Sequence, residues 1–172
     1  AEGSGFFRVE EIDGRWWFVD PDGYLFLSTG TNVLRPAMST PIAGREGYFE
    51  QLPPEVEEGG ASFYTWNLQR RFGEDWLQKW EDLTARRLDA WGLTTIGNWS
   101  HIPQTPNKPY VSVVQQWQRT APYLGLPDVY SGAFARDMDA AAAQECAPRR
   151  QDPFLLGYFI GNEPPWPGRE HD

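Results

Sequence analysis

The segment FLLGYFIGNEPPW, residues 154–166, is the part of the chain that most directly decides its fold. Residues 154–160 form a continuous apolar run after the Asp152-Pro153 turn, a pattern typical of a parallel strand that is covered on both faces. Asn162 and Glu163 follow this run directly. In barrels and open α/β sheets, ligands bind at the carboxyl ends of the strands. The segment therefore predicts a parallel sheet with polar side chains at its functional edge.

The sequence on the amino-terminal side of this segment alternates between strand and helix patterns. Apolar side chains in residues 74–91 recur with nearly helical spacing, and Gly92 follows where a helix cap is expected. Ser131 is placed to begin a second helix that Pro148 ends. In all, we expect core strands over residues 24–32, 93–99, 110–114 and 154–160, and helices over residues 74–91 and 132–147. This alternation favours an α/β fold with a parallel sheet.

The beginning of the chain has the pattern of a β meander. Residues 6–28 contain two turn signals, Asp13-Gly14 and Asp20–Gly23, between stretches that favour strands. Residues 33–68 are rich in proline and glycine, so we expect an irregular loop, which at this length is uncommon unless it is functional or mobile. We find no linker that divides the chain. A single domain over residues 1–172 is therefore expected.

The composition disfavours several classes of partner and site. Lys and Arg number 15 against 24 Asp and Glu, and the net charge of −9 disfavours nucleic acid and anionic membranes as partners. No apolar run reaches the roughly 18 residues of a membrane span. The single cysteine, Cys146, excludes an intrachain disulfide and is expected to be a small buried residue. His101 and His171 are far apart in sequence and no Cys or carboxylate spacing completes a site, so we expect no metal. No Gly-rich phosphate loop follows a strand, and no cofactor is expected.

Polar and aromatic residues gather at the predicted carboxyl ends of three core strands. They are Asn32 after the first strand, Asn98, Trp99 and His101 after the second, and Asn162 and Glu163 after the last. Apolar surroundings raise the pKa of a carboxyl group and favour its protonated form, so that it can donate a proton to a substrate. The alternative is structural: Asn162 caps a helix that starts at Pro164, and Glu163 lies in its first turn.

Residues 155–166 resemble the fourth barrel strand of clan A glycoside hydrolases, in which an Asn-Glu pair carries the catalytic acid/base. Residues 13–23 are similar to the hairpin that leads into the first barrel strand of the agarase-like and β-galactosidase-like branch. Residues 87–99 resemble its first helix and second strand, and residues 126–130 resemble the segment after its third strand. The resemblance implies the amino-terminal half of a TIM (β/α)₈ barrel over residues 24–172, with about four βα units preceded by the meander.

The resemblance also implies roles for individual residues. It makes Glu163 the acid/base of a retaining mechanism, in which two carboxyl groups lie about 5–5.5 Å apart. The nucleophilic carboxylate of the clan follows the seventh strand, and no glutamate here occupies a matching position. Sugar-binding roles are expected for Asn32, Arg35, Asn98, Trp99, His101, Asn162 and Trp166. Some of these have competing interpretations: a surface salt bridge for Arg35, a satisfied loop residue for His101, and core packing for the two tryptophans.

Two hypotheses for the function follow. The first is a retaining glycoside hydrolase acting on a polysaccharide or oligosaccharide such as an agar-type galactan. In it, this chain supplies the acid/base half, and a homodimer or a complementary carboxyl-terminal half completes the barrel. The alternative is a non-catalytic half-barrel that self-associates and at most binds carbohydrate. The missing nucleophile separates the two, and this chain alone is expected to be inactive. A secreted or periplasmic location is expected rather than a cytoplasmic one.

Overall fold

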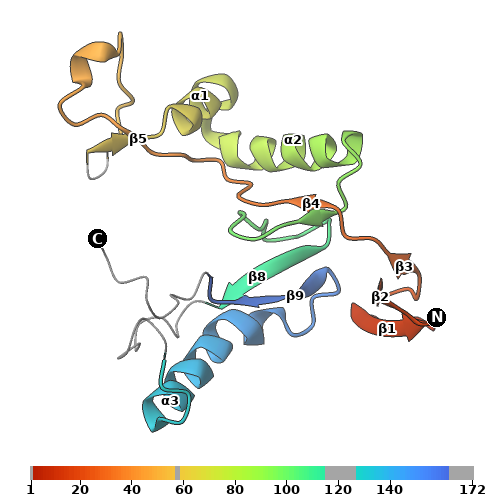
Figure 1. Ribbon diagram of the computed structural model, residues 1–172. Coiled ribbons are helices and arrows are strands. Elements are labelled where there is room, and N and C mark those ends of the chain that lie inside the picture. Colours follow the sequence, from red (N-terminus) through yellow and green to blue (C-terminus); the bar gives the residue numbers. More distant parts are fainter. Residues whose placement is uncertain (1, 57–58, 115–126, 163–172) are drawn as a thin grey trace.

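The computed structural model describes residues 2–56, 59–114 and 127–162, which form a meander, a parallel sheet and helices beside it (Figure 1). The meander is an antiparallel sheet of β1 (Arg8–Ile12), β2 (Arg15–Val19) and β3 (Leu25–Phe26). The parallel sheet has the order β4-β7-β8-β9 and consists of β4 (Gly30–Thr31), β7 (Thr95–Ile96), β8 (Tyr110–Val114) and β9 (Leu155–Ile160). The predicted α/β class and the four parallel strands in chain order are therefore confirmed.

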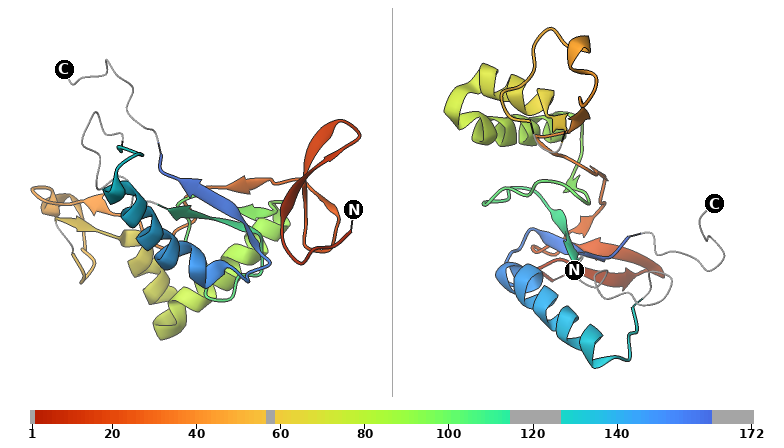
Figure 2. Two further views of the ribbon diagram at one scale, coloured as in Figure 1. Left: turned by 90° about the horizontal axis from the view of Figure 1, so that it is seen from below. Right: turned by 90° about the vertical axis from the view of Figure 1, so that its left-hand side faces the viewer.

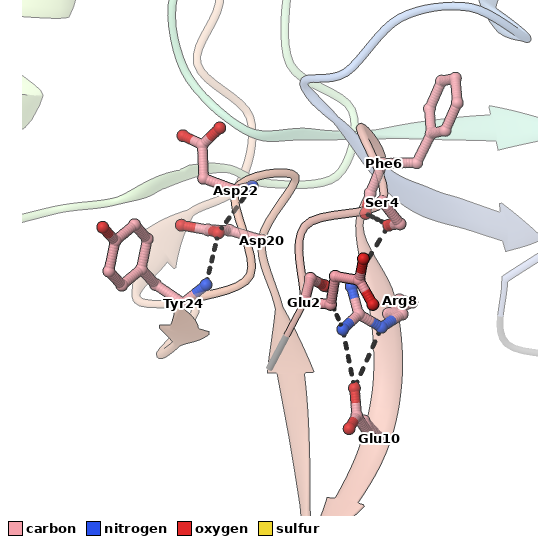
Figure 3. A network of polar contacts seen from close by, with 8 residues as sticks. All are labelled: Glu2, Ser4, Phe6, Arg8, Glu10, Asp20, Asp22 and Tyr24. Carbon is pink, nitrogen blue, oxygen red and sulfur yellow. Dashed lines mark hydrogen bonds and ion pairs between the residues drawn. The ribbon is translucent and has the colours of Figure 1, made fainter.

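Both turns of the meander form where their residues predict them. Asp13 and Gly14 have φ angles of 53° and 73°, the left-handed pair that a type I′ hairpin turn needs. In the second turn, the Asp20 carboxylate accepts the backbone N–H groups of Asp22 and Tyr24 at 3.0 and 2.8 Å (Figure 3). The aspartate side chain thus satisfies backbone donors that the turn leaves free of the sheet ladder.

The amino-terminal residues are tied to the meander by polar contacts (Figure 3). The Arg8 guanidinium forms an ion pair with Glu10 at 2.8 Å and donates to the Glu2 carbonyl at 2.8 Å. The Ser4 N–H donates to the Pro21 carbonyl at 3.1 Å. Because such partly exposed ion pairs contribute little to stability, these contacts mainly set the position of the segment.

The first predicted core strand, residues 24–32, is corrected by the structure. β3 at its start pairs with β2 in the meander, and β4 near its end joins the parallel sheet. Between β3 and β4, side-chain hydrogen bonds attach the chain to the start of β7. The hydroxyls of Ser28 and Thr95 lie 2.8 Å apart, and the Thr94 hydroxyl accepts the Thr29 N–H at 3.0 Å. Two sheets share this segment, and its apolar pattern does not show where one sheet ends.

The predicted irregular loop over residues 33–68 is also corrected. Two short strands pair within it, β5 (Thr40–Pro41) and β6 (Gly60–Ala61), and a 3₁₀ turn covers Glu46–Tyr48. The helix α1 (Phe63–Phe72) begins directly after Ser62, whose hydroxyl accepts the Thr65 N–H at 3.2 Å. This capping bond satisfies a backbone donor in the first turn. The helix therefore starts inside the segment that the proline-rich pattern predicts to be irregular.

The two predicted helices form with shifted ends. α2 (Trp76–Ala90) follows a 3₁₀ turn over Gly73–Asp75, and Gly92 terminates it with a φ angle of 69°. α3 (Gly132–Ala141) begins at Ser131, whose hydroxyl accepts the Phe134 N–H as the capping prediction requires. Pro148 does not end the helical segment, because a π turn and then a 3₁₀ turn continue to Arg149. Proline is compatible with the first positions of such a new turn.

The core lies between α2 and the parallel sheet. Leu88 of α2, Ile96 of β7 and Tyr110 of β8 form a buried cluster. Burial of a side chain as large as Leu88 stabilises the fold by about 1.5–3 kcal/mol, so the cluster helps to fix β7 and β8 and the loops that follow them. α2 runs beside β4 and β7, and α3 runs beside β9 (Figure 1, Figure 2). Cys146, predicted to be buried, is half-buried in the π turn after α3. Within the described residues, no helix has the length and apolar character to cross a membrane.

Candidate functional site

The carboxyl ends of β4 and β7 are joined by hydrogen bonds. The Gly97 N–H donates to the Thr31 carbonyl at 2.8 Å, and the Val33 N–H donates to the Asn98 carbonyl at 2.9 Å. The Asn98 N–H donates to the side-chain oxygen of Asn32 at 2.9 Å. Two predicted site residues, Asn32 and Asn98, are thus brought together at the carboxyl ends of these two strands.

Glycine makes this close approach of the strands possible. A Cβ atom on Gly97 would overlap the side-chain oxygen of Asn32, and one on Gly30 would overlap a backbone carbonyl of β7. Beyond the strands the chain turns sharply, since Val33 and Trp99 both have left-handed backbone, with φ angles of 57° and 56°. A bulky side chain in that conformation costs about 1–2 kcal/mol, and strain of this kind is concentrated at functional sites.

The side chain of Asn98 is buried, with an exposed fraction of 1%. Neither its Nδ2 nor its Oδ1 has a hydrogen-bond partner within the described part of the chain. A buried polar group without a partner costs about 1–3 kcal/mol. Asn32, in contrast, is exposed. The sugar-binding role of Asn98 therefore stays a prediction, and its side chain is closed to solvent in this structure.

The loops that follow β4 and β7 are held against each other. Arg35 donates from Nε to the Trp99 carbonyl at 2.6 Å, and the Leu34 N–H donates to the Ser100 hydroxyl at 3.1 Å. The His101 N–H donates to the Leu34 carbonyl at 2.7 Å. The bond to the Trp99 carbonyl holds the Arg35 side chain against the neighbouring loop, and its sugar-binding role stays a prediction. The half-buried Trp99 and His101 lie on a loop whose backbone these bonds position.

His101 is attached to α2. Its Nε2 atom lies 2.6 Å from a carboxylate oxygen of Glu81, and the rings of His101 and Trp80 meet in a T-shaped contact with centroids 5.6 Å apart. The Trp80 indole N–H donates to the Tyr64 hydroxyl at 3.0 Å, which connects α2 to α1. A cavity of about 550 Å³ lies between α2 and residues 101–108. The contact with Glu81 attaches His101 to α2, and the sugar-binding role of His101 stays a prediction.

Asn162 follows β9 at the same end of the sheet. Gly161 turns the chain there with a φ angle of 70°, and its N–H donates to the carbonyl of Val114 at the end of β8, at 3.3 Å. Asn162 is exposed. Because the strands are parallel, the residues that follow β4, β7 and β9 lie together at the carboxyl end of the sheet, as predicted for Asn32, Asn98 and Asn162.

The predicted acid/base, Glu163, and the predicted stacking residue Trp166 lie outside the described residues. Glu163 follows Asn162 directly in the sequence. In residues 2–56, 59–114 and 127–162, no group of three or more His, Cys, Asp and Glu side chains is placed to hold a metal ion.

Two tyrosines, the buried Tyr110 and the half-buried Tyr158, form contacts that sequence analysis missed. The Tyr110 hydroxyl donates to Asp152 at 2.7 Å, and burial, followed by this hydrogen bond, raises the pKa of Tyr110 well above its ordinary value. Burial also raises the pKa of Tyr158, whose hydroxyl donates to the Cys146 carbonyl at 3.5 Å. Both hydroxyls stay protonated at neutral pH. Tyr110 begins β8, at the opposite end of the strands from Asn32. Its contact with Asp152 holds the start of β8 to the residues that precede β9.

Agarases are the class of proteins to which this chain is similar, both in sequence and in fold. No protein-family model matches the chain. Comparisons of sequence and of structure nevertheless agree on that class, over nearly the whole chain. The resemblance to the agarase-like branch of glycoside hydrolases is therefore confirmed.

Particular relatives show how far the similarity extends. The chain is 28% identical to Beta-agarase B of Vibrio sp. (strain JT0107) over 221 aligned positions, which cover 99% of this chain and 23% of that protein. It is 27% identical to Beta-agarase A of the same organism, over 96% of this chain and 20% of the relative. The chain thus spans less than a quarter of the length of the curated relatives it matches.

Solved structures give the same result. The agarase AgWH50C matches with a TM-score of 0.82 at 29% identity, and PfGH50B matches with a TM-score of 0.79 at 26% identity. Each of these matches covers 95% of this chain and 30% of the other. An exo-beta-agarase at 22% identity shares the fold, with a TM-score of 0.81 over 95% of this chain and 32% of that one.

Proposed function

We propose that this chain is the acid/base half of a retaining glycoside hydrolase that acts on an agar-type galactan. The observation that carries the proposal is the similarity to β-agarases over nearly the whole chain, in sequence and in structure. Glu163 supports it from the sequence, because it follows directly after Asn162 at the carboxyl end of β9. A carboxyl group at that end of a parallel strand is where barrel enzymes place catalytic residues.

This proposal requires that residues 1–172 form one domain that contains half of a (β/α)₈ barrel. The order β4-β7-β8-β9 supports it, because parallel strands that neighbour one another in chain order are what a barrel is built from. Leu27, Phe159 and Ile160 are 70%, 49% and 67% exposed, which fits surfaces that further strands cover in the assembled enzyme. One feature departs from the barrel pattern: the connection from β7 to β8, residues 97–109, contains no helix.

In the proposed reaction, Glu163 protonates the glycosidic oxygen as its bond to the anomeric carbon breaks. A carboxylate from elsewhere in the enzyme attacks that carbon and forms a glycosyl intermediate. Glu163 then takes a proton from the water that hydrolyses the intermediate. The predicted sugar contacts come from the loops at this edge, through Asn32, Arg35, Asn98, Trp99, His101, Asn162 and Trp166.

The experiment that tests the proposal measures reducing ends released from agar by the enzyme that contains this chain. The wild-type enzyme is expected to cleave agar, and Glu163→Gln is expected to cleave it about 10²–10⁴-fold more slowly, because the general acid is lost. Unchanged cleavage by Glu163→Gln would remove that residue from catalysis. No cleavage of agar by the wild-type enzyme would overturn the proposed substrate. A substrate of this size also fits the proposed secreted or periplasmic location.

A second candidate function is a non-catalytic, self-associating half-barrel that binds carbohydrate. The observation that favours it is the exposure of Leu27 and Ile160 close to sheet edges, since β4 and β9 each pair with a neighbour on one side within the described residues. The same assay separates the two functions, because this candidate predicts binding to agar without cleavage.

A further inference from the structure

The excursion between β4 and α2, residues 36–72, carries aromatic side chains away from the strand-end residues of the candidate site. It projects beyond the end of the sheet toward which β8 points, which is the end that carries Asn32 and Asn98 (Figure 1, Figure 2). A hollow of about 520 Å³ on the excursion is lined chiefly by Tyr48, Phe49, Phe63, Trp66 and Arg70. These residues have no part in the proposed reaction.

The rings of this hollow are held in place by one another and by α1. The Phe49 and Phe63 rings stack with their centroids 4.9 Å apart. The guanidinium carbon of Arg70 lies 4.9 Å from the centre of the Trp66 ring, a cation–π contact that orients both side chains. Phe63, Trp66 and Arg70 all belong to α1, so the helix fixes their spacing.

The helix that carries these rings is anchored to the start of the excursion. The Ser62 hydroxyl accepts the N–H of Met38 at 3.2 Å, and the Thr65 hydroxyl donates to the Pro36 carbonyl at 2.9 Å. The pairing of β5 with β6 closes the remainder of the excursion. The hollow therefore lies on a connected framework that extends from the end of β4, rather than on an isolated loop.

Trp66 is shared by two adjoining hollows. It also lines a second one of about 260 Å³, together with Ser39, Pro53 and Gln69. Tyr48, in the larger hollow, is 83% exposed. Two open hollows that share one wall fit a long molecule that passes across the surface better than a compact ligand that is enclosed in a pocket.

The chemistry of the lining fits an uncharged sugar chain. A sugar ring has an apolar C–H face that packs on aromatic rings, and hydroxyl groups that pair with carboxylate, amide and guanidinium groups. Beside the rings, those groups are present on Glu50, Gln51, Gln69 and Arg70. Glu50 and Glu55 outweigh the single cation Arg70 by one charge, and the net charge of −9 on the chain also disfavours a polyanion.

We infer that Tyr48, Trp66 and Arg70 form an outlying subsite, which binds a galactan chain beyond the sugars held at the strand ends. The inference rests on the proposed agar-type substrate and adds a second contact region for it. Because both regions bind one chain, a long oligosaccharide gains affinity from the second contact, and a short one that does not span the two regions gains none.

The test measures the affinity of the full chain for an agar tetrasaccharide and an agar dodecasaccharide by titration calorimetry. Wild type is expected to bind the longer sugar more tightly. Tyr48→Ala and Trp66→Ala are expected to bind the dodecasaccharide about fivefold more weakly, with the tetrasaccharide unchanged. Tyr48→Ala leaves the fold intact, because its ring is exposed. Trp16→Ala is the matched control, since its ring is 69% exposed in the meander, and it should bind both sugars as wild type does.

Each other outcome counts against one of the two proposals. Wild-type affinity of Tyr48→Ala and Trp66→Ala for the dodecasaccharide would overturn the subsite and leave the proposed function standing. A malto-oligosaccharide of the same length that binds as tightly as the agar dodecasaccharide would show an unspecific aromatic surface, and would also overturn the subsite. If the wild-type chain binds neither agar sugar, the subsite is wrong, whereas the proposed substrate is decided by the agar-cleavage assay on the enzyme that contains this chain.

Discussion

The side-chain oxygen of Asn32 accepts the backbone N–H of Asn98 at 2.9 Å, and this bond joins the ends of two parallel strands. It continues the pairing of β4 with β7 by one further bond, made by a side chain instead of the backbone. The contact depends on Gly97, because any side chain there would fill the space of the Asn32 oxygen. The strand ends that precede the left-handed residues Val33 and Trp99 are therefore held at a fixed distance from each other.

Gly97→Ala is expected to destabilise the chain, because the added methyl group overlaps the Asn32 oxygen. Overpacking of this kind costs about 1–3 kcal/mol, which lowers the melting temperature by roughly 2–10 °C in a chain of this size. Thermal unfolding followed by circular dichroism measures the change. Gly47→Ala is the control, since a Cβ atom there meets no neighbouring atom. Equal melting temperatures for the two variants would contradict the close approach of β4 and β7.

Elements with a dense local signal could be predicted from the sequence. The apolar run over residues 154–160 corresponds to β9, and the helical spacing over residues 74–91 corresponds to α2. The split of residues 24–32 between two sheets could not be predicted, because pairing with β2 or with β7 is a tertiary property. α1 was missed because the prolines and glycines before Ser62 dominated the pattern of its surroundings.

The candidate site was predictable in position but not in side-chain detail. A location after a parallel strand was enough to place Asn32, Asn98 and Asn162 at one edge. The burial of Asn98 was not predictable, because beyond a strand the direction of a side chain follows local backbone angles such as those of Trp99, and not strand alternation. The attachment of His101 to α2 depends on Glu81, which is distant in sequence.

Tyr110 predicts a loss of stability at alkaline pH. Its pKa is raised in the fold, first by burial and then by the hydrogen bond to Asp152, while in the unfolded chain it is near 10. Above about pH 10 the unfolded chain releases this proton and the folded chain keeps it. The free energy of unfolding therefore falls as the pH rises. Tyr110→Phe removes the proton and is expected to flatten the fall.

Urea unfolding at several pH values between about 9 and 11 measures this slope. At neutral pH, Tyr110→Phe is expected to be less stable by about 1 kcal/mol, because the hydrogen bond to Asp152 is lost. Tyr158, whose pKa is also raised by burial, keeps part of the alkaline fall. Tyr130→Phe is the control, because that side chain is 96% exposed, and it should match wild type. An unchanged slope in Tyr110→Phe would exclude its contribution.

Glu163→Gln is expected to affect substrates according to their leaving groups. A general acid helps a sugar alkoxide to depart, whereas an activated aryl leaving group departs without a proton. In the assembled enzyme, the variant should lose most of its rate on agar oligosaccharides and much less of its rate on activated aryl glycosides. Steady-state rates on the two substrate types give the ratio. Similar losses on both would show that Glu163 does not protonate the leaving group.

The exposed apolar residues predict that the isolated chain associates with itself. Leu27 and Ile160 are 70% and 67% exposed, and β4 and β9 are the edge strands of the described parallel sheet. Unpaired backbone groups at an edge, next to apolar side chains, favour pairing with another copy. A two-fold dimer that closes a barrel is the simplest symmetric arrangement, because each copy then covers the surface of the other.

Sedimentation at micromolar concentration is expected to show a dimer for the wild-type chain and a monomer for Ile160→Lys. Ile160 ends β9, and a charged side chain there opposes burial. Tyr130→Lys is the matched control: Tyr130 is 96% exposed but lies outside the parallel sheet, so the dimer should persist. A soluble wild-type monomer that unfolds cooperatively at the same concentration would show that these surfaces need no second copy. The half-barrel would then have to be completed by another segment of the enzyme, and the non-catalytic, self-associating candidate would be wrong.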